Sequence, residues 1–255
     1  GLVQGRIAIA EDGHVAAIEG TPLALERARE PGPPLLLPGF IDLHVHGAGG
    51  RDIMEGGDAA LQVARRHAGH ATTALLATPM TAPMEALSAA LPALGPLCRT
   101  GAPGAARVLG LHLEGPYINK GKLGAQPDFA RAVSLDELRE LQALAPIRLL
   151  TLAPEVPGHL VAIPQLVAAG FRVQLGHTLG SYEDGVQALQ RGALGFTHLF
   201  NAMTPLHHRL PGLHHLAFLH QHRERDARGL GDHLRLGARL KRGGAGVTGR
   251  QRSGA

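Results

Sequence analysis

The sequence predicts an α/β protein built as an incomplete TIM-like (β/α)8 barrel, and two observations carry this prediction. Six short apolar runs alternate with stretches of helical periodicity between residues 35 and 219. Their starts are about 25–40 residues apart, a spacing typical of the repeating unit of such a barrel. Strands separated by helices pair in parallel through right-handed crossovers, so we expect the runs to form one curved sheet.

Residues 1–34 are expected to form a small partial β domain and a linker ahead of the barrel. Apolar and polar residues alternate on both sides of Glu11-Asp12-Gly13. This pattern predicts a hairpin whose arms are residues 6–9 and 14–18. Four prolines and several charges in residues 21–34 indicate a loop.

Residues 38–47 are predicted to contain the first strand of the barrel. Three leucines at 35–37 precede them, which indicates a buried strand that runs into a glycine-rich loop. His44 and His46 are two residues apart, so their side chains project from the same face of the strand. Two such imidazoles are suitable ligands for Zn²⁺, Fe²⁺ or Mn²⁺. An isolated pair of this kind is more often satisfied by ordinary hydrogen bonds.

The rest of the barrel follows as alternating helices and strands. Pro92 predicts a kink in the second helix, and Ser134 with Glu137 forms a capping-box pattern at the start of the third. Helices are predicted over residues 58–70, 83–97, 135–144, 160–169 and 182–190, and strands over residues 72–78, 107–114, 147–152, 171–176 and 195–200.

Side chains that bind metals stand at the ends of four predicted strands. His44 and His46 end the first, Glu114 ends the third, His177 the fifth, and His198 lies in the sixth. In a (β/α) barrel these ends meet on one face, where active sites lie. Each residue alone could be a loop, core or capping residue. Together, neutral imidazoles and a carboxylate form the ligand set of a hydrolytic zinc or iron site.

Three other histidines lack this placement. His67 and His70 lie in a predicted helix, and His112 lies in the middle of a predicted strand. We interpret all three as structural residues, because they do not stand where strands end.

Four motifs in this sequence point to a known family. They are His44-Val-His46, Leu111-His-Leu-Glu-Gly-Pro116, Gly176-His177-Thr178 and Thr197-His-Leu-Phe-Asn-Ala-Met203. Together they resemble the N-acetylglucosamine-6-phosphate deacetylase family of the amidohydrolase superfamily, and the resemblance extends from about Gly5 to about Leu219. It implies metal-dependent hydrolysis of N-acetylglucosamine 6-phosphate to glucosamine 6-phosphate and acetate, a step of amino-sugar catabolism.

The resemblance implies a divalent metal, zinc or iron, present as one or two ions. Glu114, His177 and His198 would hold the principal ion, and His44 and His46 would hold a second. Dihydroorotase-like members of the superfamily carry a metal-bridging lysine after strand four. Here that place is residues 151–155, Thr-Leu-Ala-Pro-Glu, without a lysine, which disfavours those members.

Substrate contacts are implied at five further positions. Asn201 and Ala202 would meet the sugar phosphate, and the guanidinium of Arg209 would bind the phosphate. Ala125 and Gln126 match a substrate-contacting turn. Many relatives carry histidine at position 126 to polarise the acetyl carbonyl, whereas glutamine donates a hydrogen bond but no proton.

The family's catalytic aspartate is not found, so the catalytic residue is unknown. Residues 220–255 contain eight glycines and eight arginines, and Asp226 and Asp232 follow no apolar run. This composition predicts an aberrant, disordered basic tail in place of strands seven and eight. We expect a frameshift near residue 220 or a fragment, and the clipped N-terminus leaves the family's β-sandwich only partial. Little or no acetate release is therefore expected from this polypeptide.

Charge and composition limit the partners. Residues 221–255 carry a net charge of +6 and the remainder −2, so the basic balance lies in the tail, which disfavours a nucleic-acid partner. Cys98 is the only cysteine, which excludes an internal disulfide. No signal-peptide pattern or membrane-length apolar run is present, so we expect a soluble cytoplasmic protein with no membrane partner. The family pattern implies a homodimer.

Two alternatives remain open. One is an inactive fragment that binds a metal or a phosphosugar. The other is an amidohydrolase acting on another N-acetylated amino-sugar phosphate, such as the galactosamine epimer, because the motifs do not distinguish the two sugars.

Overall fold

The computed structural model describes residues 2–30, 32 and 35–223 and divides into two units, Gly1–Pro38 and Gly39–Ala255. The predicted disordered tail therefore lies outside the described residues, apart from its first four.

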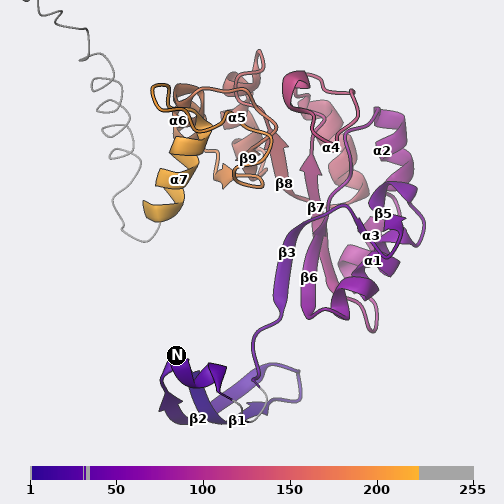
Figure 1. Ribbon diagram of the computed structural model, residues 1–255. Helices are drawn as coiled ribbons and strands as arrows, with labels where there is room; N and C mark the ends of the chain where they lie inside the picture. Colours follow the sequence, from indigo (N-terminus) through magenta and orange to yellow (C-terminus); the bar gives the residue numbers. More distant parts are fainter. Residues whose placement is uncertain (1, 31, 33–34, 224–255) are drawn as a thin grey trace, which may run out of the picture. The chain divides into compact units, whose positions relative to one another are not determined.

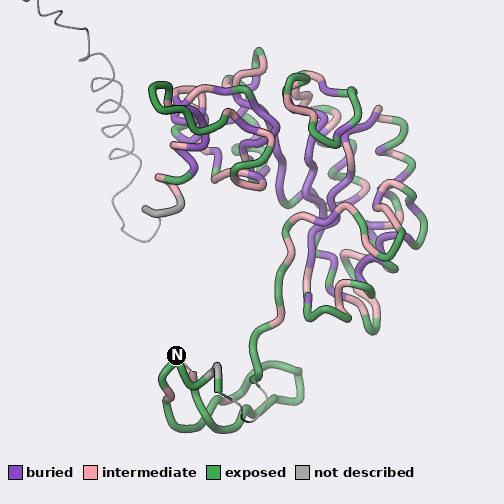
Figure 2. Tube along the Cα trace, in the orientation of Figure 1, coloured by how far each residue is buried: buried purple, intermediate pink, exposed green. Residues whose placement is uncertain are grey.

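The first unit is the predicted hairpin. Strands β1 (Leu2–Ile9) and β2 (Val15–Leu23) pair antiparallel around a turn in which Gly13 has a φ of 83°. A short 3₁₀ helix, η1 (Leu25–Arg29), follows. Nearly every residue of both strands is exposed (Figure 2). Two strands of one sheet do not confirm a β-sandwich, which stays a prediction.

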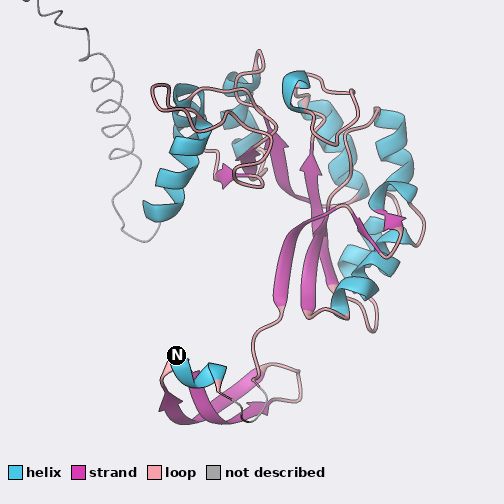
Figure 3. Ribbon diagram, in the orientation of Figure 1, coloured by secondary structure: helices cyan, strands magenta, loops and turns pink. Residues whose placement is uncertain are grey.

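The second unit is built on a six-stranded parallel sheet that curls into half of a barrel (Figure 3), which confirms the predicted α/β fold. The strands lie in chain order from one edge to the other, β10-β9-β8-β7-β6-β3. All neighbouring pairs are parallel. The strands are β3 (Phe40–Val45), β6 (Thr72–Ala77), β7 (Arg107–Glu114), β8 (Ile147–Leu152), β9 (Val173–Leu175) and β10 (Gly195–Phe196).

Helices follow the strands and pack on the sheet (Figure 1). Helix α1 contacts β6, α3 contacts β7 and α5 contacts β9. No helix in the described part of the chain is long and apolar enough to cross a bilayer. The helices are α1 (Ala59–Ala68), α2 (Met84–Ala90), α3 (Leu94–Thr100), α4 (Leu135–Leu144), α5 (His159–Ala168), α6 (Tyr182–Gln190) and α7 (Leu213–Arg223), and the short elements are β4 (Gly47–Ala48), β5 (Arg51–Asp52), η2 (Ile53–Glu55) and η3 (Lys120–Lys122).

Two helix predictions need correction. The predicted helix over residues 83–97 is divided into α2 and α3, and Pro92 lies in the break because its ring and missing N–H do not fit a helix interior. Helix α7 had no predicted counterpart. Its apolar residues follow no clear helical period. Leu213, Leu216 and Ala217 are buried where the helix packs on α6 and β10, whereas Phe218 is 50% exposed.

The predicted capping box of α4 is only half formed. The hydroxyl of Ser134 accepts a hydrogen bond from the backbone N–H of Glu137 at 3.3 Å. The Glu137 carboxylate instead accepts hydrogen bonds from Tyr117 Oη at 3.0 Å and from Arg131 Nε at 3.1 Å. A charged donor from another element is the stronger partner for this carboxylate.

Strand β3 is not the buried strand that its sequence predicts. It lies at the edge of the sheet, where Phe40 and Ile41 are 66% and 62% exposed and only Val45 is buried. The three leucines at 35–37 are exposed as well. A run of apolar residues is buried on both faces of a strand only where other strands and helices cover those faces. The local sequence pattern does not show whether such a cover exists.

His159 anchors the start of α5. Its side chain is buried, Nδ1 lies 2.8 Å from the carbonyl oxygen of Ala153, and Nε2 accepts a hydrogen bond from the N–H of Val133 at 2.9 Å. The ring is therefore neutral, with the proton on Nδ1. Burial lowers the pKa of His159 below its ordinary value of 6.5.

The lowered pKa of His159 predicts a loss of stability in acid. Between its folded and unfolded pKa values the unfolded chain binds more protons, so the free energy of unfolding should fall as the pH falls below about 6.5. His159→Asn should lower stability at pH 7.5 but reduce its further fall at pH 5.5, measured by urea unfolding. The exposed His70→Asn is the control. An equal fall in wild type and His159→Asn would contradict this prediction.

Candidate metal centre

Five side chains predicted as metal ligands meet at the carboxyl-terminal ends of the strands. Glu114 ends β7, His44 and His46 lie at the end of β3, and His177 and His198 follow β9 and β10. They form two groups that share Glu114. In each group, the ligand atoms all lie within 4.8 Å of one another.

The Glu114 carboxylate is the point on which both groups converge, and only 1% of its side chain is exposed. Its Oε1 lies 3.0 Å from His177 Nε2 and 2.8 Å from His198 Nε2. Its Oε2 lies 3.1 Å from His46 Nε2 and 3.5 Å from His44 Nε2. Each carboxylate oxygen therefore faces one pair of imidazoles.

Two of the four imidazoles are oriented as ligands by hydrogen bonds to backbone carbonyls. His46 Nδ1 lies 2.9 Å from the carbonyl oxygen of Thr78, and His177 Nδ1 lies 2.7 Å from that of Lys122. A carbonyl only accepts, so both Nδ1 atoms carry the proton and both Nε2 atoms can present a lone pair to the centre. The paired Nε2 atoms are 3.0 Å apart in each group, which requires a proton or a cation between them. This donor set fits a divalent cation.

The charge of the cluster supports the same conclusion. Burial works against ionisation of Glu114, but the interactions of its carboxylate with the four imidazoles outweigh burial and hold its pKa below the usual range. Burial likewise opposes protonation of His46 and His198, and the Glu114 carboxylate still raises the pKa of both. The cluster thus contains a fixed negative charge that needs positive partners, which a divalent ion can supply.

Two ligands stand in unusual backbone conformations. His177 has a φ of 48° and His198 a φ of 31°, in the left-handed region that residues other than glycine seldom adopt. Such conformations are found at functional sites, where the surrounding structure holds them in place.

Gln126 is hydrogen-bonded to the centre. Its Nε2 donates to Glu114 Oε2 at 2.6 Å, and its Oε1 accepts from the N–H of Thr81 at 2.7 Å. A backbone N–H can only donate, so this contact determines the orientation of the amide. Gln126 therefore orients the shared carboxylate. The substrate contact implied for it remains a prediction.

The other predicted substrate residues have no direct hydrogen bond to the metal ligands' side chains among the described contacts. Ala125 is exposed beside Gln126. Asn201 is exposed, and the carbonyl of the half-buried Ala202 accepts a hydrogen bond from the N–H of Thr178 at 2.9 Å. Arg209 is exposed in the segment that leads to α7. Their roles stay predictions.

Sequence reasoning missed the part played by Glu155. Its Oε1 accepts hydrogen bonds from the Asn119 side chain at 2.8 Å and from the Leu179 N–H at 2.6 Å. Its Oε2 accepts from the hydroxyl of Thr178 at 2.5 Å. The N–H of Asn119 in turn donates to the carbonyl of His177. Glu155 thus fixes the loop that carries a ligand, and its position just after β8 was the available signal.

His112 has the buried, mid-strand placement on which its structural interpretation rested. It lies two residues before Glu114, and its side chain is 2% exposed. Burial, followed by the neighbouring His44, lowers the pKa of His112 to about 4, so its ring is neutral.

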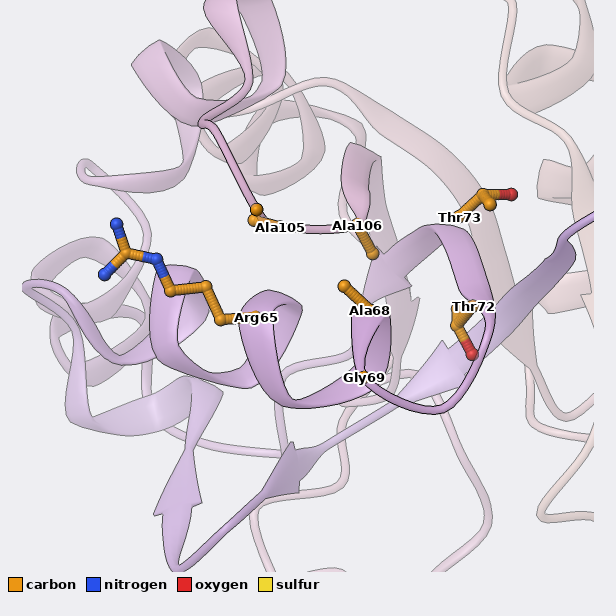
Figure 4. Close-up of a pocket in the computed structure, with 8 residues that line it drawn as sticks. Arg65, Ala68, Gly69, Thr72, Thr73, Ala105 and Ala106 are labelled. Atoms are coloured by element: carbon orange, nitrogen blue, oxygen red, sulfur yellow. The ribbon is translucent and has the colours of Figure 1, made fainter.

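A cavity of about 550 Å³ lies away from this centre (Figure 4). It is found at the amino-terminal ends of β6 and β7, whereas Glu114 lies at the carboxyl-terminal end of β7. None of its lining residues belongs to the metal centre. Its lining residues are Arg65, Ala68, Gly69, Thr72, Thr73, Gly104, Ala105 and Ala106.

No family model matches the chain. Similar curated proteins include the N-acetylgalactosamine-6-phosphate deacetylase of Escherichia coli O157:H7, 40% identical over 207 residues, which cover 79% of this chain and 54% of that protein. The N-acetylglucosamine-6-phosphate deacetylase of Vibrio furnissii is 38% identical over 221 residues, or 85% of this chain and 55% of that protein. The chain spans about half the length of the curated relatives it matches.

Solved structures show the same similarity. The N-acetylglucosamine-6-phosphate deacetylase of Thermotoga maritima has a TM-score of 0.68 at 29% identity, over 82% of this chain and 54% of that one. A mutant of the Mycobacterium smegmatis enzyme in complex with N-acetyl-D-glucosamine-6-phosphate has a TM-score of 0.64 at 34% identity, over 73% of this chain and 51% of that one. These similarities confirm the resemblance predicted from the motifs.

The shared carboxylate predicts that one substitution disables both groups. Glu114→Gln should lower the affinity for Zn²⁺ by at least about 100-fold, more than the loss of an outer hydrogen-bond partner costs. Isothermal titration of metal-free protein with Zn²⁺ measures this, with Glu140→Gln, an exposed glutamate of α4, as the control. Zinc binding by Glu114→Gln within a few-fold of wild type would contradict the assignment.

Proposed function

We propose that this chain carries the metal centre of a deacetylase that converts N-acetylglucosamine 6-phosphate to glucosamine 6-phosphate and acetate. The observation that supports the proposal is the convergence of Glu114 and four imidazoles at the ends of β3, β7, β9 and β10. The similarity to deacetylases that act on acetylated amino-sugar phosphates gives the centre its chemistry.

The ligands divide between two cation positions. Glu114, His177 and His198 would hold the principal ion, and His44 and His46 would hold a second against the other carboxylate oxygen. The ion is zinc or iron, both of which accept imidazole and carboxylate ligands. When bound, such an ion lowers the pKa of a coordinated water and polarises a carbonyl oxygen.

The chain's own residues would bind and orient the sugar. Arg209 supplies a planar cation suited to a phosphate, and Asn201 and the backbone of Ala202 supply polar contacts. His198 and these three residues belong to one segment outside regular structure, residues 197–212.

The reaction also needs a group that takes a proton from the water and delivers it to the leaving amine. The resemblance assigns this task to an aspartate that has no recognisable counterpart here. Asp226 and Asp232, the two aspartates of the tail, lie outside the described residues. We therefore expect this polypeptide to bind metal and sugar phosphate but to release acetate far more slowly than an intact relative.

A second substrate is favoured by one comparison. The relative from Escherichia coli O157:H7 is named for N-acetylgalactosamine 6-phosphate, and its identity to this chain is as high as that of the glucosamine relatives. The two sugars differ at one hydroxyl, and the residues assigned above do not address it. A non-catalytic phosphosugar-binding role is the remaining alternative. On the resemblance alone, we also propose a cytoplasmic homodimer.

The function is tested by acetate release with both sugars. The metal-free chain is supplied with Zn²⁺ or Fe²⁺ and incubated with N-acetylglucosamine 6-phosphate or its galactosamine epimer. We expect slow release that stops with a chelator and that is lost in Glu114→Gln, and the ratio of the two rates identifies the preferred sugar. Release that persists in Glu114→Gln would exclude this centre. Binding of both sugars with no release at all would favour the non-catalytic role.

The proposed phosphate contact gives a separate prediction. Arg209→Gln should weaken the binding of N-acetylglucosamine 6-phosphate about tenfold, because a charge-assisted hydrogen bond is lost. Unphosphorylated N-acetylglucosamine should not distinguish the variant from wild type. Isothermal titration calorimetry measures the binding of both sugars. The control is Arg172→Gln, which replaces an exposed arginine just before β9, at the amino-terminal end of that strand. Equal losses in the two variants would rule out a specific role for Arg209.

A further inference from the structure

A row of buried polar side chains crosses the sheet next to the metal centre. His112 lies in β7, Thr151 in β8, and Thr197 directly after β10, and their exposed fractions are 2%, 0% and 2%. His112 Nε2 lies 2.7 Å from Thr151 Oγ1, which lies 2.6 Å from Thr197 Oγ1. At the other end, His112 Nδ1 lies 2.9 Å from the carbonyl oxygen of Leu43 in β3. The row therefore connects the edge strand with the far side of the sheet.

The direction of these hydrogen bonds follows from the Leu43 carbonyl. A carbonyl only accepts, so His112 Nδ1 carries the proton and donates it. Nε2 of the neutral ring then accepts from the hydroxyl of Thr151. This leaves Thr151 to accept from Thr197 across the shorter of the two contacts of that hydroxyl, 2.6 Å against 3.2 Å to Gln174 Oε1. Every link in the row then has one donor and one acceptor.

The row ends where the sheet ladder is interrupted. Strand β3 pairs with β6 through Asp42 and again through Val45, and the register is broken between them, at Leu43 and His44. In the described structure β3 has no second neighbouring strand. The backbone that carries His44 is therefore held by His112 at a point where the ladder does not hold it.

His44 itself lacks the usual outer support of a metal ligand. Its Nδ1 is buried and has no hydrogen-bond partner within the described residues, whereas His46 and His177 each donate from Nδ1 to a carbonyl. Its ring instead contacts the ring of His112 edge-on, with centroids 4.9 Å apart and an interplanar angle of 87°. His112 thus supports both the backbone and the ring of His44.

We propose that His112 is a positioning residue of the metal centre, which holds Leu43 and His44 so that His44 stays within reach of Glu114. The inference rests on the proposed function only in taking the centre to bind metal. It assigns His112 to the cation position formed by His44 and His46. The position formed by Glu114, His177 and His198 has no hydrogen bond to His112 among the described residues, and His177 is anchored there through its own Nδ1. His198 Nδ1, like that of His44, has no hydrogen-bond partner in the described structure.

His159 provides a matched control for a role that is merely structural. It is buried to the same degree as His112, and it also has Nδ1 against a carbonyl and an acceptor bond at Nε2. It does not belong to either metal group. Replacing either histidine by phenylalanine removes two hydrogen bonds and keeps a ring in place. A general loss of stability should therefore be common to both variants.

The test is a Co²⁺ titration of metal-free wild type, His112→Phe and His159→Phe. The absorption of the bound Co²⁺ measures how much ion each protein holds. We expect two ions in wild type. In His112→Phe the second ion should bind about 10–100-fold more weakly, the range found when an outer partner of a metal ligand is removed, while the first is little changed. In His159→Phe both affinities should stay at wild-type values despite a lowered melting temperature.

Thr151→Val is the second variant, in case His112→Phe does not fold. Valine has a similar volume but no hydroxyl, so it removes one link of the row and should weaken the second ion by roughly threefold to tenfold, below the range for His112→Phe. Unchanged binding of the second ion in both variants would overturn the inference, and so would equal weakening of both ions. Wild type that binds one ion would also overturn it. Wild type that binds none would instead overturn the proposed metal centre itself.

Discussion

The arrangement of side chains at the carboxyl-terminal ends of the strands depends on the buried carboxylate of Glu114. A charge removed from water is strongly destabilising unless it is paired and hydrogen-bonded. Here its two oxygens face four imidazoles and the amide of Gln126. These partners come from β3, from the loops after β9 and β10, and from the turn at residue 126. Satisfying one charge thus brings together segments that are far apart in the sequence.

A second layer of hydrogen-bond partners, largely backbone carbonyls, surrounds the histidines that face Glu114. The carbonyls of Thr78 and Lys122 set the tautomers of His46 and His177, and Glu155 fixes the loop after His177. Carbonyl and carboxylate oxygens accept only, so each of these contacts leaves one arrangement of protons. The Nε2 atoms of His46 and His177 are therefore oriented before any ion binds, which lowers the cost of ordering them.

The first half of the edge strand β3, unlike the buried surroundings of Glu114, is exposed and has little support. Phe40 and Ile41 are exposed, and the strand has one neighbour among the described residues. Order at its second half comes from polar contacts to β6 and β7, with Thr78 bonded to the N–H of Val45 and His112 to the carbonyl of Leu43. Side-chain contacts therefore supplement the backbone hydrogen bonds that Val45 and His46 accept from Thr78 and Ile53.

The sequence alone determined the elements whose signals are local. The ranges of β7, β8, α4 and α6 agree with the prediction, because apolar alternation, helical period and the caps at Ser134 and Ser181 act within a few residues. The strand-end positions of Glu114 and the four histidines were likewise predictable, since parallel strands in one sheet share an edge. Only the tertiary structure decided which oxygen faces which histidine pair. It also decided that Gln126 contacts Glu114, that His112 supports β3, and that β3 is exposed. These contacts join residues 12 to 84 positions apart, and no local pattern encodes the distance between such atoms.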